Sequence, residues 1–188
     1  EALLESRRNR NQKIIEKLNK NGIIIDIDDV KREAGGKLLG RVHFANALIR
    51  KNYCQSIDEA FKIFLGKTGL AYEPRLNCPP ELIVEYLKEN KAFSSLAHPK
   101  LISKDENFIL DLIKKLKALG LNGLEVNYPN LTKDEKNKFK AWAKKFDLII
   151  TGGSDFHGSN RINLKLGQEG LSYEQFKKIK NFIEENKG

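Results

Sequence analysis

Three short apolar segments, each preceded by an amphipathic pattern and followed by polar residues, constrain most strongly how this chain can fold. The segments are AFSSLAHP, GLEVNYP and DLIITGGSD, and all three lie between Ala92 and Asp155. Helices that alternate with short apolar strands are typical of a parallel sheet, whose strands all end at the same side. We therefore expect an α/β fold in which the polar residues of AHP, EVNYP and GSDFHG meet at the carboxyl ends of the strands.

The preceding part of the chain has helical patterns and very little strand character. One pattern stops at Gly22, which suits the left-handed position after a helix, and Ser56 with Glu59 forms a capping box that opens a helix over IDEAFKIFL. We therefore predict two domains, a mainly helical one over residues 1–78 and an α/β one over residues 79–188. Because three strands cannot close a barrel, we expect the second domain to be part of a larger parallel α/β fold.

The composition is that of a globular protein with a basic surface. The chain has 188 residues, a hydrophobic content of 40% and a net charge of +9. Its apolar runs are far shorter than the ~20 residues of a membrane helix and no signal segment opens it, so we expect a soluble, cytoplasmic protein with no membrane partner. Most lysines are expected to cover a solvated surface, but the charge also favours anionic substrates such as phosphates or nucleic acid.

Other features of the composition restrict the chemistry. Cys54 and Cys78 have no CxxC context, so a disulfide framework or a thiolate metal site is not expected. The sequence has no GxSxG elbow and no GxxxxGK[ST] loop, which argues against a serine hydrolase and a P-loop enzyme. It also contains no Met, so we expect a segment before Glu1 in the primary translation product.

The chain has three histidines, and two of them follow predicted strands. His98 ends one strand, and His157 lies two positions after Asp155 at the end of another. Imidazole nitrogen and carboxylate oxygen suit Zn²⁺, Mn²⁺ or Fe²⁺, and the Gly152-Gly153 pair would let the backbone turn so that both side chains face one centre. The residues alone leave two interpretations open, a metal site or hydrogen-bonded structural histidines.

Glu125 and Tyr128 stand at the end of the middle predicted strand. Glu125 is either a further metal ligand or a carboxylate that faces the mouth of a barrel or pairs with a lysine, and the second interpretation is favoured. Tyr128 either lines a pocket or packs in the core.

An arginine-rich segment, SRRNRN, lies near the start of the chain. On a helix Arg7 and Arg10, or Arg8 and Asn11, share a face, so that guanidinium and amide donors lie side by side. This arrangement suits bidentate phosphate binding. A solvated helix end explains the same pattern and is favoured on the residues alone.

Taken together, SLAHP, GLNGLEVNYPN and LIITGGSDFHG, preceded by RRNRNQKIIEKLNKNG and GRVHFANALIRKNY, resemble the PHP (polymerase and histidinol phosphatase) superfamily. Within it the resemblance is to the branch of metal-dependent phosphoesterases that includes the nucleoside 3',5'-bisphosphate phosphatase and the RNase AM-like exoribonucleases. The resemblance covers nearly the whole chain. It implies the C-terminal part of a distorted (β/α) barrel of seven strands over residues 79–188, with a helical insertion domain over residues 1–78.

The resemblance also implies site residues. Family members bind a cluster of up to three divalent ions, and the matching motifs imply that His98, Asp155 and His157 are metal ligands and catalytic residues here. The implied cofactor is a cluster of Mn, Zn or Fe ions. The family's RxRN-like and GRxH segments contact substrate, which implies substrate binding by Arg8, Asn9, Arg10, Asn11 and His43.

The implied function is metal-dependent hydrolysis of phosphate esters in nucleotides or RNA ends, of the 3',5'-bisphosphate phosphatase or 5'-3' exoribonuclease type. The family's N-terminal HxHxxxSDG segment is absent from the sequence, so we expect the missing ligands in a preceding segment, without which the chain alone is incomplete and inactive. Lys100 also stands where a glycine is common in the family. The alternatives are a non-catalytic module that binds nucleotides or nucleic acid, and a structural remnant whose histidines only pack.

Overall fold

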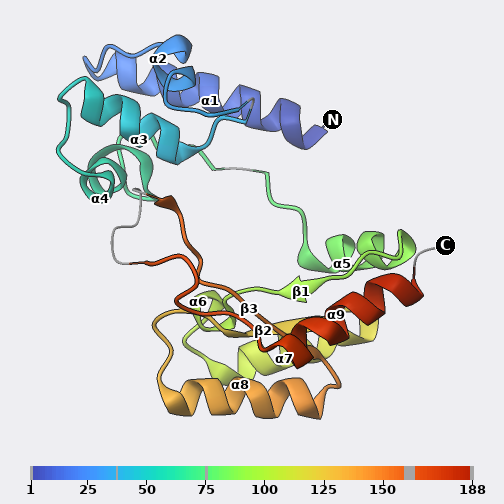
Figure 1. Ribbon diagram of the computed structural model, residues 1–188. Coiled ribbons are helices and arrows are strands. Elements are labelled where there is room, and N and C mark those ends of the chain that lie inside the picture. The colour runs from blue at the N-terminus through green and yellow to red at the C-terminus, as the bar shows by residue number, and fades with distance from the viewer. Residues whose placement is uncertain (1, 37, 75, 159–163, 187–188) are drawn as a thin grey trace. The chain divides into compact units, whose positions relative to one another are not determined.

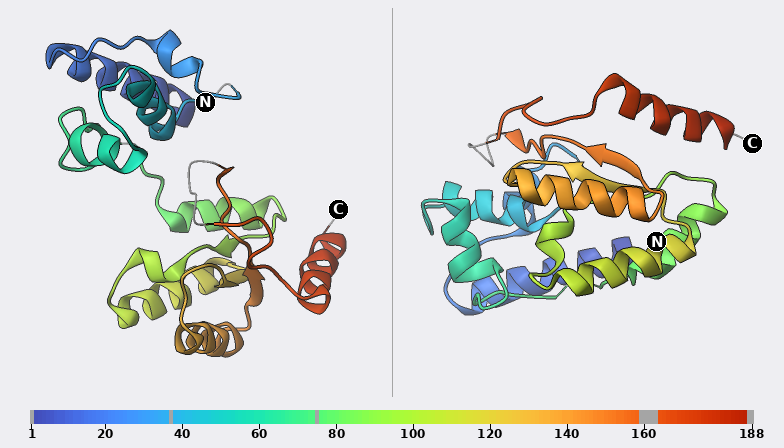
Figure 2. Two further views of the ribbon diagram at one scale, coloured as in Figure 1. Left: turned by 60° about the vertical axis from the view of Figure 1, so that its left-hand side comes forward. Right: turned by 90° about the horizontal axis from the view of Figure 1, so that it is seen from below.

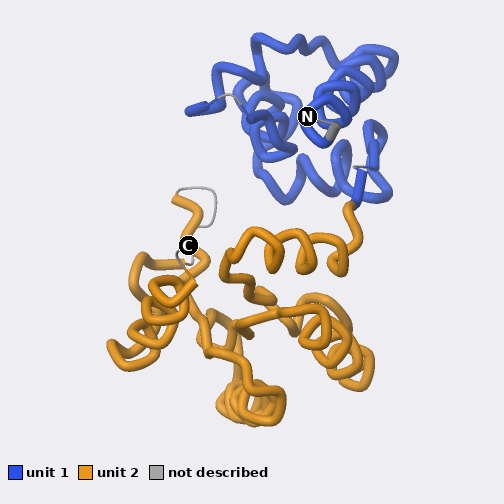
Figure 3. Tube along the Cα trace, turned by 90° about the vertical axis from the view of Figure 1, so that its right-hand side faces the viewer, with its two compact units in different colours: residues 1–77 blue, residues 78–188 orange. Residues whose placement is uncertain are grey.

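The chain forms two compact units, residues 1–77 and residues 78–188, each with its own hydrophobic core (Figure 3). The computed structural model describes residues 2–36, 38–74, 76–158 and 164–186. Within these ranges, no helix has the length and the apolar character needed to cross a membrane.

Unit 1, residues 1–77, is built from helices in the part that the structure describes (Figure 1). Because one face of each longer helix is apolar, these faces meet in a common core. The fully buried side chains of this core include Ile14, Leu18, Phe44, Leu48 and Leu65. The elements are α1 (Ala2–Lys20), α2 (Ile27–Lys31), α3 (Arg41–Arg50), α4 (Ile57–Ala60) and the π-helix η1 (Phe61–Leu65).

Short local signals set the helix ends in unit 1. After α1, Gly22 has the left-handed φ of 77° that its position in the sequence suggested. Asp26 caps α2 by accepting the backbone N–H of Asp29 at 2.8 Å. Ser56 caps α4 by accepting the backbone N–H of Glu59 at 3.1 Å, as predicted, but the other half of the predicted capping box differs, because Oε2 of Glu59 accepts the N–H of Gln55.

The helix that follows Ser56 differs from the predicted single regular helix. From Phe61 it continues as η1, and the N–H of Gly66 donates to the carbonyl oxygen of Phe61, five residues earlier, at 2.7 Å. A Cβ on Gly66 would lie 2.5 Å from that oxygen, so only a glycine permits this approach. The wider π turn is rare, and a helical pattern of apolar residues does not indicate it.

Unit 2, residues 78–188, alternates helices with short strands, which form a parallel sheet in the order β1-β2-β3 within the described residues. Figure 2 shows the helices ranged around these strands. The predicted α/β fold with a parallel sheet is confirmed, whereas its closure into a barrel stays a prediction. The elements are α5 (Pro80–Glu89), β1 (Ser95–Leu96), α6 (Pro99–Ile102), α7 (Glu106–Leu119), β2 (Gly123–Asn127), α8 (Lys133–Lys145), β3 (Ile149–Gly152) and α9 (Tyr173–Glu185).

The helix boundaries of unit 2 follow from capping residues. Thr132 and Glu135 form the capping box that begins α8, and Ser172 caps α9. Helix α7 is followed by Gly120, whose φ of 119° is accessible to glycine at little cost. These signals place the loops that carry the candidate site between well-defined helices.

The two faces of strand β2 differ, one facing the core of unit 2 and the other carrying a polar side chain. Leu124 and Val126 are fully buried, and Glu125 between them is only partly buried. Since side chains alternate across a strand, Glu125 faces away from this core. The pairing with β3 shifts between Glu125 and Asn127, so an irregularity lies where the polar residues begin.

Candidate metal centre

His98 occupies a turn that the neighbouring strand holds in place. Its backbone is left-handed, with φ 44° and ψ 54°, immediately before α6. The backbone N–H of His98 donates to Oε2 of Glu125 at 2.8 Å. The imidazole ring also makes an edge contact with the ring of Tyr128, with 5.6 Å between the ring centroids. Glu125 and Tyr128 together fix the direction in which the imidazole leaves β1.

Four side chains at the carboxyl ends of the three strands lie close to one another, each in contact with at least one of the others. Nε2 of His98 lies 3.4 Å from Oε2 of Glu125 and 3.6 Å from Oδ1 of Asp155. Nδ1 of His157 lies 3.6 Å from the same oxygen of Asp155. The structure thus brings together His98, Asp155 and His157, and it adds Glu125 to them.

The donor types and the pairwise spacing fit a divalent transition metal. Imidazole nitrogen with carboxylate oxygen suits zinc, manganese or iron. Two ligand atoms on one tetrahedral ion lie about 3.4 Å apart when each bond is about 2.1 Å long, which is close to the spacing around His98. Within the described part of the chain, however, no three His, Cys, Asp or Glu side chains are gathered as a ready metal-binding group. The donors are therefore close to one another without surrounding a common point.

The turn after β3 differs from the expectation for Gly152 and Gly153. Neither glycine has a positive φ, and the left-handed residue is Asp155 itself, with φ 48°. A Cβ on Gly152 would collide with the carbonyl oxygen and the Cβ of Asn127, whereas Gly153 has open space around it. Gly152 is therefore required for close packing of β3 against β2, and the ligand-bearing turn is made by an aspartate.

Tyr128 is almost fully buried and contacts the turn around His98 with both its ring and its hydroxyl. The hydroxyl accepts the backbone N–H of Lys100 at 3.1 Å. Burial raises the pKa of Tyr128 to about 12, so the phenol is neutral at physiological pH. The ammonium of Lys100 contacts Oε1 of Glu135 at 2.7 Å, and this contact turns its charge toward α8.

The residues predicted to bind substrate occupy different surroundings in unit 1. Arg10 and Asn11 are both buried, and a guanidinium nitrogen of Arg10 donates to Oδ1 of Asn11 at 2.8 Å. The side-chain amide of Asn11 donates to the carbonyl oxygen of Leu39 at 3.3 Å. Arg8 is exposed. In His43, Nδ1 accepts the backbone N–H of Gly40 at 3.0 Å and so caps α3.

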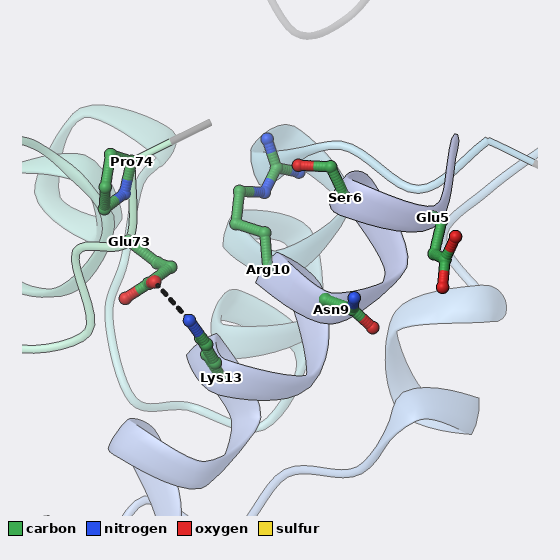
Figure 4. Close-up of a pocket in the computed structure, with 7 residues that line it drawn as sticks. All are labelled: Glu5, Ser6, Asn9, Arg10, Lys13, Glu73 and Pro74. Atoms are coloured by element: carbon green, nitrogen blue, oxygen red, sulfur yellow. Dashed lines mark ion pairs between the residues drawn. The ribbon is translucent and has the colours of Figure 1, made fainter. Parts of the chain in front are cut away.

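Two of these residues, Asn9 and Arg10, line a cavity of about 390 Å³ in unit 1 (Figure 4). Ser6 and Lys13 from the same helix also line it, and Glu73 closes its far side. Lys13 pairs with Glu73 at 3.3 Å, and Lys17 pairs with the same carboxylate at 2.7 Å. These contacts hold the pKa of Glu73 below its ordinary value, chiefly through the hydrogen bond from Lys17.

Sequence reasoning missed Ser6, Lys13 and Glu73 as neighbours of the arginine-rich segment. Ser6 and Lys13 lie on the face of α1 that carries Arg10, so the helical period could have identified them. Glu73 could not be found in this way, because no local pattern connects it to α1.

The chain is similar to enzymes that act on RNA or nucleotides. It is 32% identical over 160 residues to a 5'-3' exoribonuclease of Haemophilus influenzae, with 83% of this chain and 58% of that protein aligned. It is 27% identical over 153 residues to a 5'-3' exoribonuclease of Escherichia coli, with 81% and 52% aligned. It is 28% identical over 123 residues to a 3',5'-nucleoside bisphosphate phosphatase of Chromobacterium violaceum, with 64% and 42% aligned. The chain thus spans about half the length of the curated relatives that it matches.

Two solved structures share the fold. A protein of Bifidobacterium adolescentis assigned as a metal-dependent phosphoesterase superposes with a TM-score of 0.81 at 23% identity, covering 96% of this chain and 64% of that one. An amidohydrolase of Chromobacterium violaceum, solved with bound sulfate and no metal, superposes with a TM-score of 0.80 at 22% identity and the same coverage. No family model matches the chain.

Proposed function

We propose that this chain belongs with its relatives to the PHP family of phosphoesterases, and that it serves metal-dependent hydrolysis of phosphate esters in nucleotides or RNA ends. In this proposal unit 2 is the C-terminal segment of a distorted (β/α) barrel of seven strands, and unit 1 is a helical insertion domain. The substrate type is that of its relatives, a 3',5'-bisphosphate nucleotide or the 5' end of an RNA.

The observation that carries the proposal is the convergence of His98, Glu125, Asp155 and His157 at the ends of the parallel strands. In parallel α/β folds these ends are where catalytic side chains lie. We propose His98, Asp155 and His157 as ligands of a divalent ion cluster of manganese, zinc or iron. The resemblance implies further ligands in the family's HxHxxxSDG segment and at its next His and Glu, which the 188 residues do not contain.

Each side chain of the proposed site has a distinct task. Glu125 holds the backbone of His98 by accepting its N–H, and the carboxylate of Asp155 lies 3.6 Å from one imidazole nitrogen of His98 and one of His157. A divalent ion bound there would lower the pKa of a water molecule and polarise the phosphoryl oxygen. The neutral phenol of Tyr128 fills the space behind His98 and excludes water from that side.

We propose that unit 1 contributes the phosphate grip. Asn9 and Arg10 share the cavity with Ser6 and Lys13, so guanidinium, amide, hydroxyl and ammonium donors line one hollow, which the carboxylates of Glu5 and Glu73 also line (Figure 4). Such donors suit a phosphate that is not the reacting one. We propose that Arg8, Asn11 and His43 also bind substrate, beside this cavity. Asn11 and His43 also have structural hydrogen bonds, and substitution of either will affect folding as well as binding.

The experiment that tests the metal centre is elemental analysis of the purified chain after incubation with Mn²⁺ or Zn²⁺ and desalting. We expect bound metal that is lost in His98→Ala and in Asp155→Ala. The matched control is Asp111→Ala, which removes an exposed aspartate of unit 2 that is not one of the four converging side chains. Equal metal content in all four proteins would contradict the ligand assignment. Release of phosphate from a 3',5'-bisphosphate nucleotide then tests the reaction itself.

A second candidate function is a module that binds nucleotides or nucleic acid without hydrolysing them. The net charge of +9 and the lack of a gathered three-donor group within the described residues favour it. This function predicts binding that weakens with salt and does not depend on metal, whereas the phosphoesterase requires metal.

A further inference from the structure

Besides the cavity in unit 1, a second hollow lies in unit 2, away from the candidate metal centre. It has a volume of about 390 Å³ and is formed by α8, the start of β3 and α9. Lys140 and Lys144 of α8 and Lys178 of α9 line it, together with Gln175. We call these four residues the basic groove. Both helices pack against β3 (Figure 1).

The lysines of the basic groove differ from other lysines on the same helix. Lys136 pairs with Glu169 at 2.5 Å, and Lys138 pairs with Glu106. In the described part of the chain, Lys140, Lys144 and Lys178 have no carboxylate within ion-pair distance. On α8, acidic partners therefore neutralise one set of lysines and leave the groove side positive.

The positive charges on this side of α8 repel one another. Lys140 and Lys144 are four residues apart, and like charges at this spacing repel one another across one turn. Asp147 also lines the hollow, so the lining contains three ammonium groups and one carboxylate. An anion bound between the two helices would relieve the repulsion.

The rest of the lining offers one side-chain amide and no aromatic surface for a base. The side-chain oxygen of Gln175 already accepts the backbone N–H of Ser172 at 3.0 Å, which leaves its amide N–H groups for a ligand. The floor is aliphatic, with Leu148, Ile149 and Ile150, and the hollow has no aromatic lining on which a base could stack. Recognition here would be electrostatic and independent of sequence.

We propose that the basic groove binds the phosphate backbone of single-stranded RNA, beyond the segment that reaches the metal centre. The groove lies at the start of β3, at Ile149 and Ile150, whereas Asp155 follows the opposite end of this strand. A strand whose terminal phosphate is at the metal centre must pass over the protein surface, and cations on two helices can hold successive phosphates of it. This inference rests on the proposed action on RNA ends.

The test measures binding of a fluorescein-labelled oligouridylate to the chain by fluorescence anisotropy, over a range of salt concentrations. The variant combines Lys140→Gln, Lys144→Gln and Lys178→Gln. We expect its Kd to rise roughly tenfold or more at low salt, and the slope of log K against log salt to fall by about 2, because three phosphate contacts are lost.

A matched control keeps the net charge equal. Lys114→Gln, Lys145→Gln and Lys177→Gln remove three exposed lysines of unit 2 that do not line the groove and have no carboxylate partner in the described residues. We expect this control to bind oligouridylate nearly as tightly as the unchanged chain. Equal losses in the two triple variants, or no loss in either, would overturn the proposal, because general charge would then account for binding.

Two further readouts separate this inference from the proposed function. Metal content and hydrolysis of a 3',5'-bisphosphate nucleotide are expected to be the same in the groove variant and the unchanged chain. A selective loss of oligouridylate binding supports the groove even if the chain neither holds metal nor hydrolyses nucleotides. Competition by uridine monophosphate at the same concentration of phosphate groups would overturn the assignment to an RNA chain, since a single phosphate would then suffice.

Discussion

Asp29 in unit 1 and Glu125 in unit 2 are both shielded carboxylates, but their neighbours differ. Asp29 contacts the ammonium of Lys51 and lies 3.3 Å from a guanidinium nitrogen of Arg50. Glu125 has no lysine or arginine within ion-pair distance in the described residues, and its neighbours are the N–H and the imidazole of His98. A carboxylate held by fixed cations stabilises the fold, whereas one that contacts an imidazole but no lysine or arginine is available to an external cation.

The largest expected effect tests whether the two units fold by separate cores. Phe44→Ala empties a fully buried position in unit 1 and is expected to cost about 3–5 kcal/mol there. Trp142, the only tryptophan, lies in unit 2, so its fluorescence reports on that unit. We expect the far-UV circular dichroism transition to shift and the fluorescence transition to stay. Leu124→Ala, in the core of unit 2, is expected to reverse the pattern, and coincident shifts in both variants would show one cooperative body.

The next prediction makes the same chemical change in both units. Asp29→Asn removes the charge that Lys51 and Arg50 share, and we expect it to lower the free energy of unfolding by about 2 kcal/mol with no change in metal affinity. Glu125→Gln is expected to change stability little and to weaken metal binding roughly 10- to 100-fold, because the support of His98 is altered. Urea unfolding and metal titration of both variants check this. A destabilised Glu125→Gln with unchanged metal affinity would remove the distinction between the two carboxylates.

Acid should affect unit 1 through the same carboxylate. The hydrogen bond from Lys51 is the main cause that holds the pKa of Asp29 below its ordinary value of 3.8. A lowered folded-state pKa means that the stabilisation is complete above the ordinary value and is lost as the pH falls through the folded value. We therefore expect the stability difference between the unchanged chain and Asp29→Asn to shrink below about pH 4. Urea midpoints at pH 7 and pH 3 measure it, and a constant difference would count against the pairing.

The smallest effect concerns the turn behind His98. Tyr128→Phe leaves the N–H of Lys100 without its acceptor and is expected to cost about 1 kcal/mol. Because burial raises the pKa of Tyr128 to about 12, its neutral form adds stability below the ordinary value of 10.0, and this is lost as the pH rises from 10.0 toward 12. An alkaline absorbance titration should lose its latest-titrating tyrosine in the variant. Loss of an earlier one would mean that the phenol is not shielded.

Local signals predicted much of the fold, and long-range contacts explain what they did not. The capping box of Thr132 with Glu135 and the glycine at 120 set helix ends because the atoms involved are few residues apart. The π-helix was missed because it depends on the approach of Gly66 to Phe61, which an apolar pattern does not encode.

The candidate site was predicted to a similar extent. His98, Asp155 and His157 were identified from their places after strands, and their meeting follows from parallel topology. The acceptance of the N–H of His98 by Glu125 depends on the register between β1 and β2, which composition does not specify. Likewise, Glu73 reaches Lys17 across 56 positions of the chain. The roles of all these residues stay predictions until metal and substrate are measured.

The left-handed backbones at His98 and Asp155, with φ of 44° and 48°, bear on laboratory evolution of this protein. Glycine adopts this conformation freely, whereas other residues pay of order 1 kcal/mol for it. A library screened for heat resistance alone would therefore enrich glycine at both positions. The selected variants would be more thermostable but would lack two of the three proposed metal ligands. Such a screen must therefore be paired with a selection for metal binding.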